Sequence, residues 1–218
     1  DQVSAHRGLV QPVVEIAARC RAAGVPLWVD AAQALGHVDC ATGADAVYST
    51  SRKWLAGPRG VGVLAVAERH WDVLNLRRRA KHPADLPPMR TLESEEAHVA
   101  GRVGLAQAVL ELMDSGPAEV VARLDEVGRL TREAAAGLDG WAVVGNSPAR
   151  AITALRPTRG QDVLEARHHL LTDHRILTTA ALPWRAPGEL APGALRLSPH
   201  VDCTDDDLAR VVAALAEL

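Results

Sequence analysis

Short hydrophobic runs separated by turn residues mark the first part of the chain. Three of them are five or six residues long and are bounded by Gly, Pro, Asp or Ser: Val25–Val29, Ala44–Tyr48 and Val61–Val66. Runs of this length and setting are typical of buried strands. Helical spacing over Val13–Ala23 predicts a helix that feeds the first strand, and so a βαβ unit with parallel strands. The tight turn Gly57–Gly60 predicts that the third strand runs antiparallel.

The second half of the chain alternates helical periodicity with short apolar runs. Helices are predicted at Ser94–Asp114, Ala118–Leu138 and Gln161–Thr172, with a closing helix that Thr204 caps. Strands are predicted at Trp141–Val144, Ala151–Leu155, Arg175–Thr179 and Ala194–Leu197. In the first of these helices, the spacing of Val99, Val103, Ala106, Val109, Leu110 and Met113 predicts a buried face. We therefore expect an α/β part at residues 1–82, an exposed linker at 83–94 and a small α+β domain at 95–218.

Composition narrows the class of protein. A chain of 218 residues that is 48% hydrophobic can bury a sizeable core. The net charge of -3 shows no basic excess, which argues against a nucleic-acid partner. No apolar run approaches the roughly 18 residues of a membrane span, and no signal peptide is visible. We expect no membrane partner.

The positions of the cysteines and histidines indicate the redox compartment of the protein and whether it has a metal site. The three cysteines, Cys20, Cys40 and Cys203, are an odd number without a CxxC pair, so we expect a reducing cytoplasm and no disulfide framework. The stretch from His37 to Cys40 lacks a second ligand cluster, and His168-His169 is more typical of a solvated helix face. The sequence therefore predicts no metal site.

Polar residues follow the ends of the first two predicted strands. Asp30 closes the first strand, and Lys53 follows the second with Trp54 and Leu55 beside it. In an open α/β sheet the carboxyl ends of the strands form the ligand crevice. Taken alone, Lys53 also fits an exposed loop lysine and Asp30 a helix cap. Together they match pyridoxal phosphate chemistry, which needs an amine to hold the aldehyde and an acid to keep the ring nitrogen protonated.

At these residues the chain resembles the class V aminotransferase family, the fold-type I pyridoxal phosphate enzymes that include the cysteine desulfurases. VDAAQALGHVD resembles the family pattern V-D-x-A-Q-x-x-G-H, and TSRKWLAGPRGVGVL resembles S-x-H-K-W-x-x-G-P-x-G-x-G-x-L. ALRLSPHVDCTDDDLARVVAAL is similar to a third pattern, R-x-S-x-x-x-Y-N-T-x-x-[DE]-[IL]. The resemblance implies that residues 1–82 are the C-terminal part of a cofactor-binding large domain, with a mostly parallel sheet and helices.

The resemblance also implies a role for each matching residue. Lys53 would be the Schiff-base lysine, Asp30 the partner of the pyridine nitrogen and Gln33 a ligand of the ring hydroxyl. Thr50 and Arg52 stand where the family binds phosphate, and Arg196 where it holds the substrate carboxylate; the alternative for Arg196 is a surface arginine at a strand edge. His6 lies next to a position that, in the family, is near the cofactor and the substrate. Relatives are homodimers, and Thr91 is our candidate for the residue that reaches the partner's site.

The reaction is narrowed by a departure from the family pattern. Desulfurases carry a reactive cysteine before the substrate arginine, and residues 178–193 contain none. This favours a carbon–sulfur β-lyase that cleaves a cysteine S-conjugate sulfoxide to a sulfenate, pyruvate and ammonia. An aminotransferase or desulfurase on the same fold remains an alternative. So does a non-catalytic fragment, because the resemblance implies an upstream segment with a ring-stacking aromatic residue. Without that segment, the 218 residues should bind the cofactor poorly.

Overall fold

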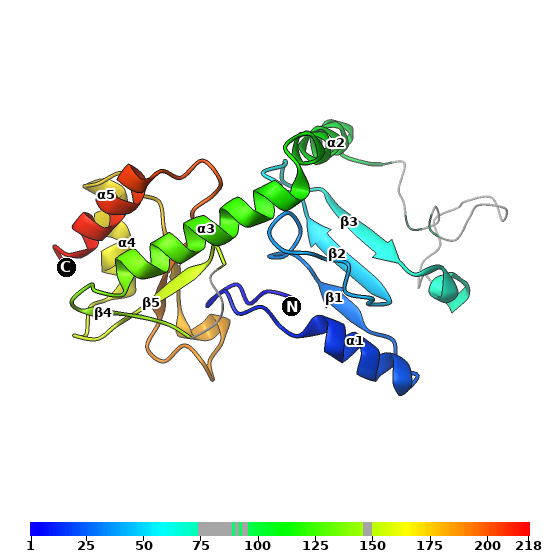
Figure 1. The fold of residues 1–218 in the computed structure, drawn as a ribbon, viewed down its shortest axis with the longest axis horizontal. Coiled ribbons are helices and arrows are strands. Elements are labelled where there is room, and N and C mark those ends of the chain that lie inside the picture. Colours follow the sequence, from blue (N-terminus) through cyan, green and yellow to red (C-terminus); the bar gives the residue numbers. More distant parts are fainter. Residues whose placement is uncertain (74–88, 90–91, 93–95, 146–149) are drawn as a thin grey trace. The chain divides into compact units, whose positions relative to one another are not determined.

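The computed structural model describes residues 1–73, 89, 92, 96–145 and 150–218. The chain forms two compact units (Figure 1). Unit 1 contains residues 1–2 and 12–114, and unit 2 contains residues 3–11 and 115–218. Each unit has its own sheet. Most of the expected linker at 83–94 lies outside the described residues.

Unit 1 is built around a sheet with the strand order β1-β2-β3. Its elements are α1 (Val13–Ala22), β1 (Trp28–Asp30), β2 (Ala46–Thr50), β3 (Gly62–Val66), the 3-10 helix η1 (Glu68–Val73) and α2 (Val99–Asp114). β1 and β2 are parallel, and β2 and β3 are antiparallel, as the tight turn predicted. The expectation of a mostly parallel sheet is therefore not met among the described strands, because the turn between β2 and β3 reverses the chain.

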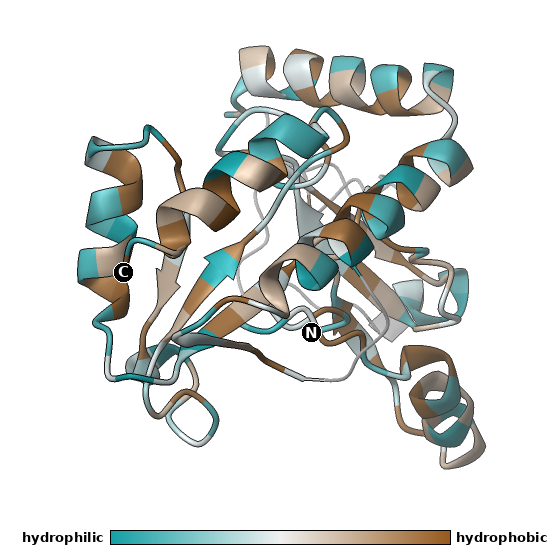
Figure 2. Cartoon of the chain, turned by 60° about the vertical axis from the view of Figure 1, so that its left-hand side comes forward, coloured by the Kyte–Doolittle hydropathy of each residue, from teal (hydrophilic) through white to brown (hydrophobic). Residues whose placement is uncertain are grey.

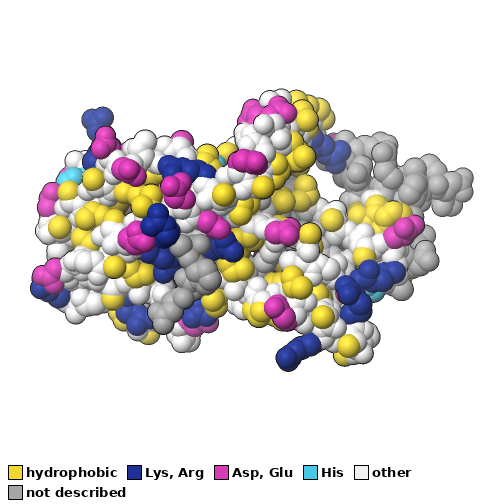
Figure 3. Space-filling view, viewed as in Figure 1, with side chains coloured by type: hydrophobic (Ala, Val, Ile, Leu, Met, Phe, Trp, Pro, Cys, Tyr) yellow, Lys and Arg dark blue, Asp and Glu magenta, His cyan; other side chains and the backbone are white. Residues whose placement is uncertain are grey.

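Two surfaces of unit 1 are more exposed than the sequence pattern predicted. Val63 and Leu64 of β3 are about two-fifths exposed. In α2 the apolar residues expected inside, such as Val99, Val103 and Met113, lie on the surface, while the residues buried are Gly101 and Ala108. Hydrophobic side chains are visible along α2 at the top of Figure 3. Periodicity identifies the apolar face of a helix but not the body that covers it.

Unit 2 combines three helices with an antiparallel sheet of strand order β4-β5-β7-β6. Its elements are α3 (Pro117–Ala135), β4 (Trp141–Val143), β5 (Thr153–Pro157), α4 (Val163–Thr172), β6 (Thr179–Ala181), the 3-10 turn η3 (Pro183–Arg185), β7 (Ala194–Leu197) and α5 (Asp205–Leu215). The main core joins Leu195 and Leu197 of β7 to Leu170 of α4 and to Val211 and Leu215 of α5. The helices carry alternating hydrophobic and hydrophilic bands (Figure 2), as expected where one side packs on a core.

At the helix ends in unit 2, one boundary was predicted correctly from the local sequence and another was not. Thr204 forms the predicted cap of α5, a capping box with Asp207. The strand expected at 175–179 was wrong, since β6 begins only at Thr179. The reason is that the backbone N–H of Ile176 donates to Leu170 O at 2.7 Å, so these residues close α4 instead of pairing in the sheet. No described helix has both the length and the apolar character needed to span a bilayer.

Candidate active site

The carboxyl ends of β1 and β2 place Asp30 and the lysine-bearing loop at one edge of the unit 1 sheet. Asp30 pairs with Tyr48 in the parallel register, and β2 ends two residues later. One carboxylate oxygen of Asp30 accepts the backbone N–H of Ala32 at 2.7 Å, which fixes the side chain at the strand end. The Ser49 hydroxyl donates to Ala31 O at 3.1 Å and so ties the segments after the two strands together. The chain segments that carry Asp30 and Lys53 thus follow neighbouring strand ends.

The loop that carries Lys53 is held from inside by Ser51. This serine is fully buried, and its hydroxyl is within hydrogen-bond reach of Pro58 O and of Val61 O, the second at 3.2 Å. The loop also closes on itself, because Gly57 N–H donates to Ser51 O at 3.0 Å. A Cβ on Gly57 would lie 3.0 Å from the Ser51 Cβ, so a larger residue would require the neighbouring atoms to shift by a few tenths of an ångström. Lys53 is half-buried on this rigid turn.

A tryptophan orients the amide of Gln33. The Trp54 indole N–H donates to Gln33 Oε1 at 3.1 Å, and the ring of His37 stacks on Trp54 with centroids 4.2 Å apart. His37 Nδ1 is 2.9 Å from Gln33 O, one helical turn earlier. Because an indole N–H can only donate, Gln33 Oε1 is the acceptor and its amide nitrogen is the end left to donate to a ligand. Such a donor suits the phenolic oxygen of pyridoxal phosphate.

The supporting role of Trp54 and His37 was missed by sequence reasoning, which treated His37 only as a possible metal ligand. The signal that could have found His37 is its spacing of four residues from Gln33, one helical turn. Thr50 ends β2 and pairs with Gly62, and Arg52 is exposed on the lysine loop. Their phosphate-binding roles stay predictions. Thr91 lies outside the described residues.

Arg196 is the candidate substrate ligand in unit 2. It lies on β7, between Ala154 of β5 and Thr179 of β6. Its Nη1 donates to Ala5 O at 2.8 Å and its Nη2 to Thr179 Oγ1 at 3.3 Å. Its Nε is buried without a hydrogen-bond partner within the described parts of the chain. Burial, with a smaller effect of the nearby Arg185 charge, lowers the pKa of Arg196.

This environment is suited to an anion. Among the described residues, Arg196 forms no ion pair with a carboxylate. A buried guanidinium whose N–H groups are only partly satisfied carries a desolvation cost that a ligand carboxylate offsets, and its planar fork matches the two carboxylate oxygens. The alternative of a surface strand-edge arginine does not fit, because β7 lies inside the sheet between two strands.

His6 is engaged on both sides of its ring. Its Nδ1 lies 3.1 Å from Ser4 Oγ and its Nε2 2.7 Å from Glu189 Oε2. Arg7 Nη1 also lies 3.3 Å from this carboxylate. The hydrogen bond from His6, followed by the charge of Arg7, lowers the pKa of Glu189. The structure therefore gives His6 a role in fixing the segment that also supplies Ala5 O to Arg196, and its contact with substrate stays a prediction.

The pKa values of two of the three cysteines are raised. Burial, with the charge of Asp39, raises the pKa of Cys40 to about 11. Burial also raises the pKa of Cys203, with help from Asp207 and other nearby acids. All three cysteines are free, and thiolate is the nucleophilic form of the side chain. A raised pKa lowers the thiolate fraction, which does not favour Cys40 or Cys203 as a sulfur acceptor.

Comparisons with known proteins identify the family of the chain. Residues 1–155 match the family model described as "Aminotransferase class-V". The chain is 47% identical over 218 residues to the probable hercynylcysteine sulfoxide lyase of Mycobacterium tuberculosis, a match that covers 98% of this chain and 54% of that protein. It is 30% identical to the isopenicillin N epimerase of Amycolatopsis lactamdurans, over 99% of this chain and 58% of that protein.

A solved structure shows the same fold. The apo cysteine desulfurase of Thermococcus onnurineus has a TM-score of 0.86 and 21% identity, over 99% of this chain and 58% of that chain. At this identity the likeness concerns the fold alone. The chain spans little more than half the length of these three relatives.

Proposed function

The chain belongs to the class V aminotransferase family, and from this premise we propose that it is part of a pyridoxal phosphate-dependent carbon–sulfur lyase. The family uses pyridoxal phosphate, and two features of the described residues fit that group and its amino-acid substrate. The bond from Trp54 to Gln33 Oε1 leaves the Gln33 amide nitrogen as the donating end, and Arg196 has a buried Nε that a carboxylate can satisfy. Asp30, fixed at the strand end by Ala32 N–H, supplies an acceptor for a protonated ring nitrogen.

When bound, pyridoxal phosphate supplies an electron sink for the carbanion formed at the substrate α carbon. Lys53 would hold the cofactor aldehyde, and once the substrate amine has replaced it there, the freed Lys53 amine would take the α proton of the substrate. Arg196 orients the substrate through its carboxylate, and Thr50 with Arg52 is proposed to bind the phosphate. The electron pair left at the α carbon would then expel the sulfur, so that the Cβ–S bond breaks and the sulfoxide sulfur leaves as sulfenate. Water then releases pyruvate and ammonia from the remaining three-carbon unit.

The observation that carries the choice of a lyase is the lack of a cysteine between residues 178 and 193. A desulfurase needs a thiol there to accept sulfur, whereas a sulfenate leaves without one. The raised pKa values of Cys40 and Cys203 also support this choice. The 47% identity to a probable hercynylcysteine sulfoxide lyase supports hercynylcysteine sulfoxide as the substrate, and thereby a step in ergothioneine biosynthesis.

We also propose a homodimer with active sites at the interface, to which Thr91 contributes. The exposed apolar residues of α2 support an association of this kind, since a soluble monomer rarely leaves a helix face of this character uncovered. The partners are then a second copy of the chain and a small amino-acid substrate. Nucleic acid and membrane are not proposed.

The test is pyruvate release from hercynylcysteine sulfoxide in the absence of a keto-acid acceptor. A lyase gives pyruvate under these conditions, whereas an aminotransferase gives none and a desulfurase gives alanine. The variant Lys53→Ala should lose both pyruvate formation and the visible absorbance of lysine-bound cofactor. A wild-type chain that stays colourless with pyridoxal phosphate, while the Mycobacterium tuberculosis relative turns yellow, would support the alternative of a non-catalytic fragment.

A further inference from the structure

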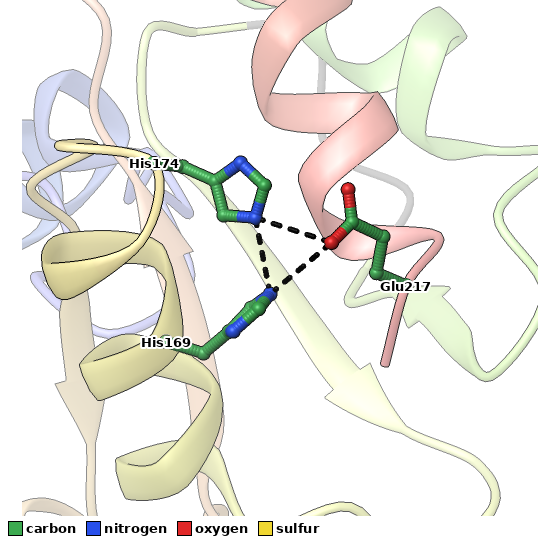
Figure 4. Close-up of side chains that lie close together, drawn as sticks. All are labelled: His169, His174 and Glu217. Atoms are coloured by element: carbon green, nitrogen blue, oxygen red, sulfur yellow. Dashed lines mark hydrogen bonds and ion pairs between the residues drawn. The ribbon is translucent and has the colours of Figure 1, made fainter.

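Two histidines and a glutamate of unit 2 converge at the ends of two helices. His169 lies in the last turn of α4, and His174 follows directly after the C-cap of that helix. Glu217 lies two residues beyond the end of α5. Figure 4 shows His169 Nε2, His174 Nε2 and one Glu217 carboxylate oxygen pointing toward one another. Imidazole nitrogen and carboxylate oxygen are common ligands of divalent transition metals.

The spacing of these three atoms matches a tetrahedral ion. His174 Nε2 lies 3.1 Å from His169 Nε2 and 3.3 Å from Glu217 Oε2, and His169 Nε2 lies 3.7 Å from the same oxygen. Ligands bound to Zn²⁺ at about 2.0–2.1 Å in a tetrahedron are about 3.3 Å apart. The three atoms therefore form nearly one face of such a tetrahedron and need only a few tenths of an ångström of adjustment.

A carboxylate behind one of the histidines favours the same interpretation. Asp173 Oδ2 lies 2.8 Å from Nδ1 of His169, and the other oxygen of Asp173 accepts the Thr172 hydroxyl at 2.8 Å. A proton on Nδ1, shared with Asp173, leaves the lone pair of His169 Nε2 directed at the cluster. Histidines that bind metals commonly have a partner of this kind, which orients the ring and raises its basicity.

His174 Nε2 lies close to two possible hydrogen-bond acceptors, His169 Nε2 and Glu217 Oε2. One proton cannot serve both acceptors well. A divalent cation satisfies all three lone pairs at once. The side chains of both histidines are one quarter exposed, so an ion can reach the site from solvent.

We propose that His169, His174 and Glu217 bind a zinc ion, with water in the fourth position. This differs from the sequence-based expectation of no metal site, and it does not depend on the proposed lyase function. The ion connects the end of α4 to the chain just beyond α5. Both helices pack on β7, so the ion acts as a structural clip on that side of unit 2.

The test is calorimetric titration of Zn²⁺ into the 218-residue chain after treatment with a chelator. We expect one tightly bound ion per chain in the wild type and a loss of affinity of at least about 100-fold in His174→Gln. Asp173→Asn should bind roughly 10-fold more weakly, because the ring of His169 loses its orienting partner. The matched control is His168→Gln, which removes an exposed histidine from the same helix and should bind like the wild type.

Two further measurements keep the proposal open to refutation if His174→Gln folds poorly. Glu217→Gln changes a side chain that is more than half exposed, and it should also weaken Zn²⁺ binding. Saturating Zn²⁺ should raise the melting temperature of the wild type and of His168→Gln by roughly 5–10 °C, and leave Glu217→Gln almost unchanged. Absence of Zn²⁺ binding by the wild type, or equal affinity in the wild type, His174→Gln and Glu217→Gln, would overturn the proposal.

Discussion

Replacing Arg196 by lysine tests the proposed substrate contact with little change in charge. The guanidinium donates to Ala5 O and to Thr179 Oγ1, and its buried Nε has no hydrogen-bond partner among the described residues. An ammonium group is a single point of donation on a flexible stem, and it cannot present the planar fork that binds both oxygens of a carboxylate. Arg196→Lys should therefore retain the electrostatic attraction and lose one of two charge-assisted hydrogen bonds.

The expected size of the effect follows from that lost bond. A hydrogen bond between charged groups contributes about 1.5–3 kcal/mol, which corresponds to a change in affinity of about 10- to 150-fold. The carboxylate takes no part in bond breaking, so the contact is made equally with substrate and transition state. KM should therefore rise by about this factor while kcat changes little. Steady-state pyruvate release from the sulfoxide substrate measures both constants.

The matched control is Arg156→Lys, an arginine on the neighbouring strand β5 whose side chain is exposed. It removes the same chemical group from the same sheet and should leave KM unchanged. A melting curve for each variant separates binding from folding, because loss of the bond to Ala5 O alone should cost about 1 kcal/mol of stability. If Arg196→Lys changes KM less than Arg156→Lys does, the assignment of the carboxylate to Arg196 is wrong.

Three other predictions concern the fold and the cofactor contact. Trp54→Phe removes the indole donor to Gln33, so pyridoxal phosphate should bind about 3- to 10-fold more weakly in an absorbance titration. The indole of Trp71 donates to Val66 O at 3.0 Å, and Trp71→Phe should leave the binding of pyridoxal phosphate unchanged. Gly128→Ala places a Cβ against Arg150 O and 2.9 Å from Ala151 N. It should therefore lower the unfolding free energy by about 1–3 kcal/mol, despite the better helix propensity of alanine. Gly137→Ala, whose added Cβ would have no atom within 4 Å, should not lower the unfolding free energy. The hydrogen bond from Leu27 N–H, with His70 and Arg69, lowers the pKa of Asp45 to about 2. The ionised carboxylate should therefore contribute about 1–2 kcal/mol to the unfolding free energy above the ordinary pKa near 4, and this contribution should be lost as the pH falls toward 2. Urea unfolding should show the stability of the wild type converging with that of Asp45→Asn in acid, and a constant difference would contradict this reasoning.

The sequence predicted best where a local signal was sufficient. The cap at Thr204 and the strand Ala194–Leu197 were predicted at the observed residues, because each depends on neighbours in the chain. β1 and β2 are parallel, so Asp30 and the segment that leads to Lys53 follow neighbouring strand ends, and the roles of these two residues stay predictions. These features need no knowledge of distant contacts.

The features that the sequence did not predict depend on segments far apart in the chain. The bond from Trp54 to Gln33 requires the turn after β1 to fold back under the lysine loop. Gly128 of α3 packs against the backbone of Arg150, just before β5. Strand β5 begins at Thr153 and not at Ala151, where the sequence predicted it. The cluster at His174 requires Glu217, which only the packing of α4 and α5 on one sheet brings near. Periodicity specifies which face of an element avoids water and not which partner it meets.

Side chains alternate between the two faces of β7, so the proposed zinc site and the proposed substrate contact of Arg196 can be tested independently. Leu195 and Leu197 face the core that contains α4 and α5, while Ala194, on the same side of the strand as Arg196, packs in a second cluster with Ala154. A zinc ion at the helix ends therefore stabilises the layer behind β7 and touches neither Arg196 nor its ligand. Removing the ion should lower the melting temperature and leave KM unchanged, whereas Arg196→Lys should raise KM in the presence of zinc. The two proposals thus concern opposite faces of the same strand, with Arg196 on one face and the core that the ion would stabilise on the other.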